Sequence, residues 1–225
     1  MPESVNRDDL LSELYDKTLV GNGPEVLTLT RQGLSDGLGP EVLLYEALIP
    51  ALEEVGARFE RGDFFVPEML IAGKAMAGAL DILRPLLAET GAETIGKVVI
   101  GTVKGDVHDI GKNLVNIMFE GAGFEVIDLG VQVSPEKFVN AVIEHKPDIL
   151  GFSAFLTTTM PMFKANMNAL TKAGLRDEVI IMVGGAPVTQ EYADVVGADG
   201  YAADASAAVV KAKELLRRRR ALANA

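Results

Sequence analysis

Residues 97–113 read KVVIGTVKGDVHDIGKN, in which a β-branched run leads into a polar loop bounded by glycines. Four more apolar runs follow, and sequence of helical character separates them. The runs are 97–103, 124–130, 148–154, 179–185 and the weaker 198–202, and the helices are expected at about 111–122, 135–145, 159–173, 188–195 and 204–218. This alternation predicts an α/β domain with a five-stranded parallel, doubly wound sheet in the flavodoxin-like (Rossmann-like) order.

The preceding part of the chain, residues 8–88, has a different periodicity. Apolar residues recur there at spacings of three and four, and turn sequences at 21–24, 37–40 and 61–63 divide the stretch into four segments. The pattern predicts a four-helix bundle. We therefore expect a helical-bundle cap domain at residues 1–90 and an α/β domain at 97–225, with a small polar linker at about 89–96.

Composition narrows the classes of function. Asp and Glu total 32 against 21 Lys and Arg, a net charge of −11 that disfavours binding to nucleic acid. The chain has no Cys, which excludes disulfides, thiolate-bound zinc and iron–sulfur clusters. Neither a signal peptide nor an apolar run of membrane-spanning length is visible, so we expect a cytoplasmic protein that does not enter a membrane.

The loop Gly105–Asn113 follows the first predicted strand, at the edge of the sheet where doubly wound domains bind ligands. His108 offers a ring nitrogen to a metal, and a carboxylate two residues away can hold the other nitrogen. On local sequence alone, a helix-capping Asp beside an incidental histidine explains the loop equally well. Zinc is disfavoured because His145, expected at a helix end, is the only other histidine; one histidine suits a metal that arrives inside a macrocycle.

Three spaced motifs resemble the cobalamin-binding family shared by methionine synthase and the corrinoid proteins of methyltransferase systems. The family pattern is Asp-x-His-x-x-Gly, then Ser-x-Leu, then Gly-Gly. This chain has Asp106–Gly111, Ser153-Ala154-Phe155 and Gly184-Gly185 at matching spacings, with Phe155 in place of Leu. That departure affects the fine shape of the pocket for the cofactor's nucleotide tail. Residues 64–76 also resemble the end of the helical cap in these proteins.

The resemblance implies that cobalamin binds base-off and His-on, so that His108 is the ligand to cobalt. Asp106 would hold the far ring nitrogen and Ser153 would extend this proton relay. Phe65 and Met69 would cover the methyl-bearing face, although such residues at helical spacing are more often bundle core. The full set expected to contact the cofactor is Gly105, Asp106, Val107, His108, Asp109, Ile110, Gly111, Ser153, Phe155, Thr157, Gly184, Gly185, Ala205, Phe65 and Met69.

The function that the resemblance implies is a corrinoid methyl carrier, the non-catalytic subunit of a multi-component methyltransferase. A donor-specific methyltransferase would methylate Co(I), and a second enzyme would pass the methyl group of methylcobalamin to tetrahydrofolate or coenzyme M. A reductive activase is a further candidate partner. Methylamines, methanol, glycine betaine and aryl methyl ethers are all compatible methyl donors.

Two other functions stay open at this point. One is a cobalamin-responsive sensor or storage module, and the other is a flavodoxin-like domain that has lost its ligand. A chain of 225 residues has no room for the extra substrate and reactivation domains of methionine synthase, which favours the carrier. In a carrier the cap must move to expose cobalt, so the 89–96 linker is the expected hinge.

Overall fold

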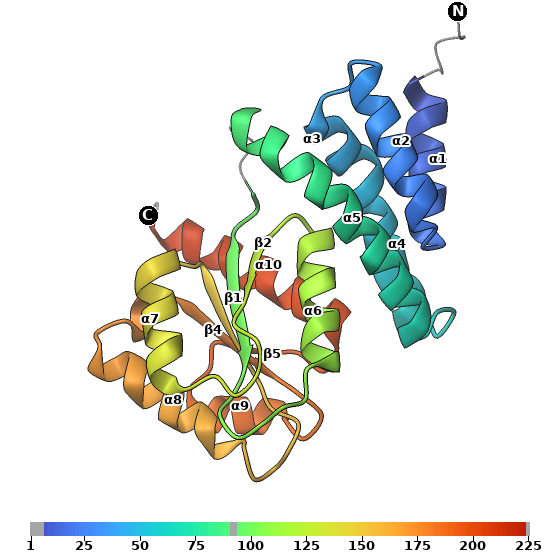
Figure 1. Cartoon of the computed structure of the whole chain (residues 1–225). Helices are drawn as coiled ribbons and strands as arrows, with labels where there is room; N and C mark the ends of the chain where they lie inside the picture. Colours follow the sequence, from blue (N-terminus) through green and yellow to red (C-terminus); the bar gives the residue numbers. More distant parts are fainter. Residues whose placement is uncertain (1–6, 91–93, 224–225) are drawn as a thin grey trace, which may run out of the picture. The chain divides into compact units, whose positions relative to one another are not determined.

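Figure 1 shows the computed structural model of the chain, which describes residues 7–90 and 94–223. The chain forms two compact units whose main boundary falls between residues 93 and 94. Each unit is described by itself. Residues 91–93 of the expected linker lie outside the described residues, and its role as a hinge stays a prediction.

The first unit is helical. Its elements are α1 (Arg7–Leu19), α2 (Gly23–Ser35), α3 (Pro40–Leu43), a π-helical turn (Leu44–Leu48), α4 (Ile49–Glu60) and α5 (Val66–Thr90). Because α3, the π-helical turn and α4 follow one another without a break, the described unit consists of four helical rods, as the periodicity predicts. Pro50 has no N–H to donate to the preceding turn, which accounts for the wider turn just before it.

Regularly spaced apolar side chains form the core of this unit. They come from every rod and are almost completely buried: Leu10, Leu14, Val26, Leu43, Leu48, Leu52, Met69 and Leu83. Burying such side chains is the main force that holds a bundle of short helices together, because isolated helices of this length are marginal in water.

The second unit alternates strands and helices. Its elements are β1 (Lys97–Thr102), α6 (Ile110–Gly121), β2 (Glu125–Asp128), α7 (Pro135–His145), β3 (Ile149–Ser153), α8 (Pro161–Lys172), a 3₁₀ turn (Arg176–Glu178), β4 (Ile180–Gly184), α9 (Gln190–Val196), β5 (Gly200–Tyr201) and α10 (Ala205–Ala223). All neighbouring strands are parallel, in the order β2-β1-β3-β4-β5. The predicted fold class is confirmed.

Helices cover both faces of this sheet, which is why the inner strands β1, β3 and β4 are almost continuously buried and apolar rather than alternating. Figure 1 shows α7 and α8 against one face and α6 and α10 on the other. One core cluster joins strand residues such as Val99 and Phe152 to Phe138 of α7 and Phe163 of α8. The chain leaves β1 toward β2 and later returns to β3 on the other side, so the loops after β1 and β3 diverge at a topological switch point.

Candidate functional site

The loops after β1 and β3 come together at the switch point. The Val103 amide donates to the Ser153 carbonyl at 3.0 Å, which continues the strand pairing into both loops. The Thr102 hydroxyl donates to the His108 carbonyl at 3.0 Å and so holds the far end of the first loop against β1. The two loops therefore meet at the carboxyl edge of the sheet, where doubly wound domains bind ligands.

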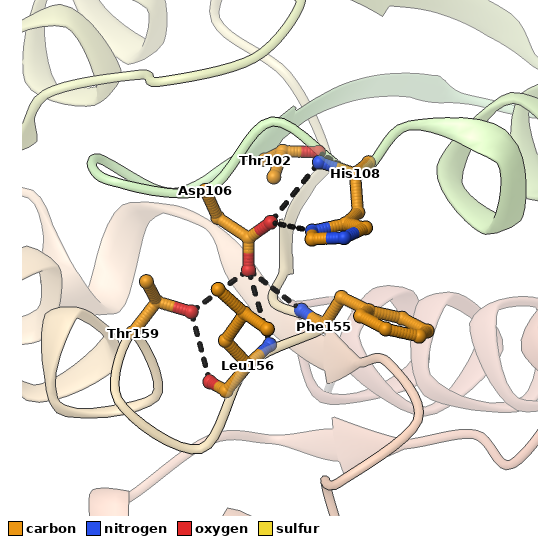
Figure 2. A network of polar contacts seen from close by, with 6 residues as sticks. All are labelled: Thr102, Asp106, His108, Phe155, Leu156 and Thr159. Carbon is orange, nitrogen blue, oxygen red and sulfur yellow. Dashed lines mark hydrogen bonds and ion pairs between the residues drawn. The ribbon is translucent and has the colours of Figure 1, made fainter.

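The carboxylate of Asp106 lies at the centre of this junction and is completely buried (Figure 2). Its Oδ1 accepts hydrogen bonds from the His108 backbone amide at 3.0 Å and from His108 Nδ1 at 2.7 Å. Its Oδ2 accepts from the Phe155 amide at 2.8 Å, the Leu156 amide at 3.2 Å and the Thr159 hydroxyl at 2.8 Å. One buried side chain thus joins both loops.

These contacts decide the charge of Asp106. Burial raises the pKa of its carboxyl, but hydrogen bonds from His108, Phe155 and Thr159 outweigh burial and hold the pKa well below its usual range. Asp106 is therefore ionised at neutral pH and only accepts hydrogen bonds, so the proton in the short contact with the ring lies on His108 Nδ1.

His108 presents its other ring nitrogen, Nε2, as a ligand. Within the described residues no hydrogen bond involves Nε2, and 43% of the side chain is exposed. A neutral imidazole protonated on Nδ1 has its lone pair on Nε2, and a carboxylate on Nδ1–H raises the basicity of that lone pair. The ring of Phe155 stacks on the imidazole, with 4.4 Å between centroids and 25° between planes.

Apolar side chains also lie on the same two loops as this imidazole and at the start of α6. Four of them are exposed to solvent in the structure: Val107, Ile110, Phe155 and Leu156. Exposed apolar side chains gathered around one oriented polar group are typical of a ligand site.

The glycines of the site fall into two kinds. Gly185 has φ +127°, and a Cβ there would lie 1.9 Å from the Ala154 carbonyl oxygen, so the fold itself requires glycine. At Gly184 a Cβ would meet only the Ala202 carbonyl oxygen at 3.6 Å, and at Gly111, in the first turn of α6, it would meet nothing within 4 Å. The fold therefore requires glycine at Gly185, whereas at Gly111 and Gly184 the neighbouring residues would leave room for a Cβ.

The structure brings Asp106 and His108 together but does not place Ser153 with them. Ser153 ends β3, paired with Thr102 and Gly184. Among the described residues no hydrogen bond joins its hydroxyl to Asp106. Thr159 supplies the hydroxyl instead, because the loop after β3 folds back before α8 and returns Thr159 to the carboxylate. A relay through Ser153 stays a prediction without support in this geometry.

Thr159 belongs to the hydrogen-bond network around Asp106 and was missed by sequence reasoning. The run Thr157–Thr159 offers three adjacent hydroxyls, and the motif that it follows does not distinguish them. Thr157, the one expected to contact the cofactor, is exposed, whereas Thr159 is buried.

The remaining expected contacts are spread over both units. Gly105 adopts φ +85° at the turn before Asp106, and the Asp109 carbonyl accepts from the Asn113 amide at 2.7 Å at the start of α6. Ala205 is buried at the start of α10. In the helical unit Met69 is buried in the core and Phe65 is exposed. Cofactor contact by these residues stays a prediction.

A buried cation beside the site was also missed. Lys112 of α6 is 1% exposed in its side chain and pairs with Asp128 at the end of β2. Its ammonium also donates to Asn113 Oδ1 at 2.7 Å, and Asn116 Nδ2 donates to the same Asp128 carboxylate at 3.0 Å. Lysine is rarely buried without a partner, so this pair fixes α6, and with it the end of the His108 loop, against β2.

Comparison with known protein families gives matches over both units. Residues 96–210 match a family model described as a B12 binding domain, and residues 10–84 match a second model with the same description. None of the helices within the described residues has the length and apolar character needed to cross a membrane.

Curated relatives match along nearly the whole chain. A dimethylamine corrinoid protein from Methanosarcina barkeri is 42% identical over 213 residues, which cover 94% of this chain and all of the relative. A corrinoid protein from Desulfitobacterium hafniense is 40% identical over 210 residues, which cover 92% of this chain and 97% of the relative.

Two solved structures are also similar to this chain over most of its length. A cobalamin-binding protein from D. hafniense has a TM-score of 0.72 at 30% identity and covers 92% of this chain and 97% of its own. A chain of a methanol:cobalamin methyltransferase complex from M. barkeri has a TM-score of 0.83 at 28% identity, with 96% of this chain and 82% of its own covered.

Proposed function

Since the chain belongs to the corrinoid proteins of methyltransferase systems, we propose that it binds a cobalamin-type corrinoid through His108 and carries a methyl group between two methyltransferases. The observation that carries the proposal is the imidazole of His108, which the buried Asp106 carboxylate holds at the switch point with Nε2 available.

The residues of the site fit such a cofactor. A corrinoid would arrive with its cobalt already bound within the macrocycle, so a single imidazole from the protein, that of His108, would be enough to hold the metal. The exposed apolar side chains around His108 suit the face of a broad macrocycle. Gly111 and Gly184 leave space into which no neighbouring side chain packs, which suits close approach of a bulky ligand to the backbone. When bound, the corrinoid supplies the chemistry of accepting and donating a methyl group.

The chain's own residues tune the axial ligand. Asp106 keeps the proton on Nδ1 and the lone pair on Nε2, which strengthens Nε2 as a ligand. The Thr159 hydroxyl and two loop amides keep that carboxylate ionised and fixed in place. Ligation at His108 would therefore depend on the ionised carboxylate that holds its ring.

The relatives point to a class of methyl donor. One is named a dimethylamine corrinoid protein, and a structural neighbour belongs to a methanol:cobalamin methyltransferase complex. We propose a donor-specific methyltransferase for a small methylated amine or alcohol as the first partner. A second methyltransferase using tetrahydrofolate or coenzyme M would be the other, and a reductive activase would be an accessory.

The test is reconstitution with hydroxocobalamin labelled with nitrogen-15 in its benzimidazole, followed by desalting and reduction to Co(II). The expected result is a retained corrinoid whose electron paramagnetic resonance (EPR) spectrum shows nitrogen-14 splitting, since the axial nitrogen comes from the protein. His108→Ala should lose this splitting, and His145→Ala, which changes the chain's other histidine, should keep it. A colourless protein after desalting, or nitrogen-15 splitting in the wild type, contradicts the proposal.

Carrier function needs a separate assay. Reduced, loaded protein should accept a methyl group from dimethylamine or methanol in the presence of a matching methyltransferase and lose it to a second one. Loaded protein that exchanges no methyl group with either kind of enzyme, yet changes its oligomeric state with adenosylcobalamin, would favour a sensor instead.

A further inference from the structure

We infer that Phe155 is a positioning residue that fixes the orientation of the His108 imidazole by stacking on its face. The consequence for cobalt ligation rests on the proposed function, whereas the stacking itself does not. Phe155 stands where the family motif has Leu, so the ring is a feature of this chain rather than of the motif.

Asp106, His108 and Phe155 each contact the other two residues. Asp106 Oδ1 accepts from the His108 ring at 2.7 Å, and Asp106 Oδ2 accepts from the Phe155 amide at 2.8 Å. The two rings then meet each other at 4.4 Å between centroids with 25° between their planes. Figure 2 shows both rings on the same side of Asp106. The carboxylate therefore sets the position of the imidazole and of the ring that stacks on it.

The stack supplies a restraint that the hydrogen bond does not. The imidazole is tethered at Cβ and held through Nδ1, but its plane can still tilt between these two points, because a hydrogen bond to a carboxylate tolerates a broad range of angles. A flat neighbour against one face stops that tilt. Since the Nε2 lone pair lies in the plane of the ring, fixing the plane fixes the direction in which His108 can bind a metal.

Exposure supports a role beyond packing. Phe155 remains 51% exposed although it contacts His108, so it is not held there by burial in a core. An aromatic pair contributes more than the area that it buries, typically about 0.5–1.5 kcal/mol. Leucine would keep the apolar character at this position but would offer no flat face to the imidazole.

The first test uses the protein without corrinoid. Ring-current shielding from Phe155 should move the carbon-bound imidazole protons of His108 upfield, and His145 serves as an internal reference because the chain has only these two histidines. Phe155→Leu should abolish the upfield shift and Phe155→Tyr should retain it. Spectra at several pH values separate ring current from protonation. Equal His108 shifts in wild type and Phe155→Leu overturn the stack.

The second test uses the same three proteins loaded with the labelled hydroxocobalamin and reduced to Co(II). The ratio of His-bound to His-free cobalt, measured by nitrogen splitting in EPR, should fall about two- to tenfold in Phe155→Leu, the range that the strength of an aromatic pair implies. Phe155→Tyr should restore it. An unchanged ratio in Phe155→Leu overturns the positioning role.

The two tests separate this inference from the proposed function. If wild type shows the upfield shift but retains no corrinoid, the proposed function fails and the consequence for cobalt fails with it, while the stack itself stands. If wild type binds corrinoid through His108 and Phe155→Leu leaves the ratio unchanged, only the inference fails.

Discussion

At the scale of single residues, the buried Asp106 carboxylate organises the site. It accepts five hydrogen bonds from two loops, and these outweigh the effect of burial on its pKa. A buried carboxylate without such partners would be protonated or would unfold the site. The stability of the two loops and the tautomer of His108 therefore depend on the same ionised group.

This dependence predicts a pH-dependent cost for Asp106→Asn. The lowered pKa means that folding favours the ionised carboxyl, so its contribution to stability is complete above the ordinary pKa of about 4 and is lost as the pH falls toward the folded value. At pH 7 the amide should cost about 2–4 kcal/mol, because it cannot accept from all five donors. Urea unfolding of both proteins should show a constant difference between pH 7 and about pH 5, and a difference that shrinks as the pH falls below about 4.

Removing the hydroxyl of Thr159 is a milder change at the same carboxylate. Thr159→Val keeps the shape and removes one donor, and it should cost about 1 kcal/mol. Ser153→Ala is the matched control and should change stability less. A larger loss from Ser153→Ala than from Thr159→Val would contradict the assignment of the hydroxyl to Thr159.

The adjacent glycines Gly184 and Gly185 predict opposite phenotypes. Gly185→Ala places a methyl group on the Ala154 carbonyl oxygen at positive φ and should cost about 3–5 kcal/mol or prevent folding. Gly184→Ala meets only ordinary contacts and should change stability by less than about 1 kcal/mol. Under the proposed function it should still weaken corrinoid binding, which spectroscopic titration measures. Full affinity in Gly184→Ala would mean that the cofactor does not use this space.

At the scale of elements, the ion pair between α6 and β2 positions the helix that follows the His108 loop. The two partners differ in environment: the Lys112 side chain is 1% exposed and that of Asp128 is 36% exposed. Asp128 also accepts from Asn116 Nδ2 and from the Gly130 amide at 2.8 Å. Removing Asp128 therefore leaves a buried ammonium, whereas removing Lys112 leaves a partly exposed carboxylate.

This asymmetry predicts unequal effects on stability. Among the described residues, Asp128→Ala leaves the buried ammonium with Asn113 as its one remaining partner, and it should cost about 2–4 kcal/mol. Lys112→Met keeps the apolar stem and leaves a carboxylate with two other donors and partial contact with water, so it should cost about 1 kcal/mol. Chemical denaturation measures both values. Equal losses would show that the burial of Lys112 does not set the cost.

At the scale of the whole molecule, each unit has a core of its own. Leu14 lies in the helical core, and Phe138 lies in the core of the α/β unit. Separate cores predict that the units can unfold in separate steps, so a single free energy of unfolding need not describe the chain.

Corrinoid should stabilise the α/β unit through the binding equilibrium. At a free concentration of about 100 times Kd, hydroxocobalamin should add about 2.7 kcal/mol to the step in which this unit unfolds. In calorimetry the unfolding transition of the α/β unit should therefore move to higher temperature. This transition is the one whose midpoint temperature falls in Phe138→Ala, because Phe138 lies in the core of that unit. His108→Ala should remove most of the shift caused by corrinoid. An equal shift in His108→Ala would mean that corrinoid binding does not depend on ligation by His108.

The sequence by itself determined the alternation of strands and helices, the strand order and the four helical segments. The alternation and the helical segments follow from local periodicity, and short apolar runs without polar alternation are typical of strands covered on both faces. The strand order follows from the doubly wound arrangement that this alternation favours. It also made the Asp106–His108 contact possible, because two residues of separation place the carboxylate within reach of the ring, and the spaced motifs favoured it over an incidental histidine.

Only the tertiary structure decided which residues from distant segments join that pair. Thr159 and the Phe155 ring reach Asp106 and His108 because the loop after β3 folds back across the switch point, about 50 positions along the chain from Asp106. A motif fixes spacing along the chain, but the path of a loop fixes which of several similar side chains turns inward. Burial of Thr159 rather than Thr157, and of Lys112 against Asp128, follows from that packing and leaves no periodic signal in the sequence.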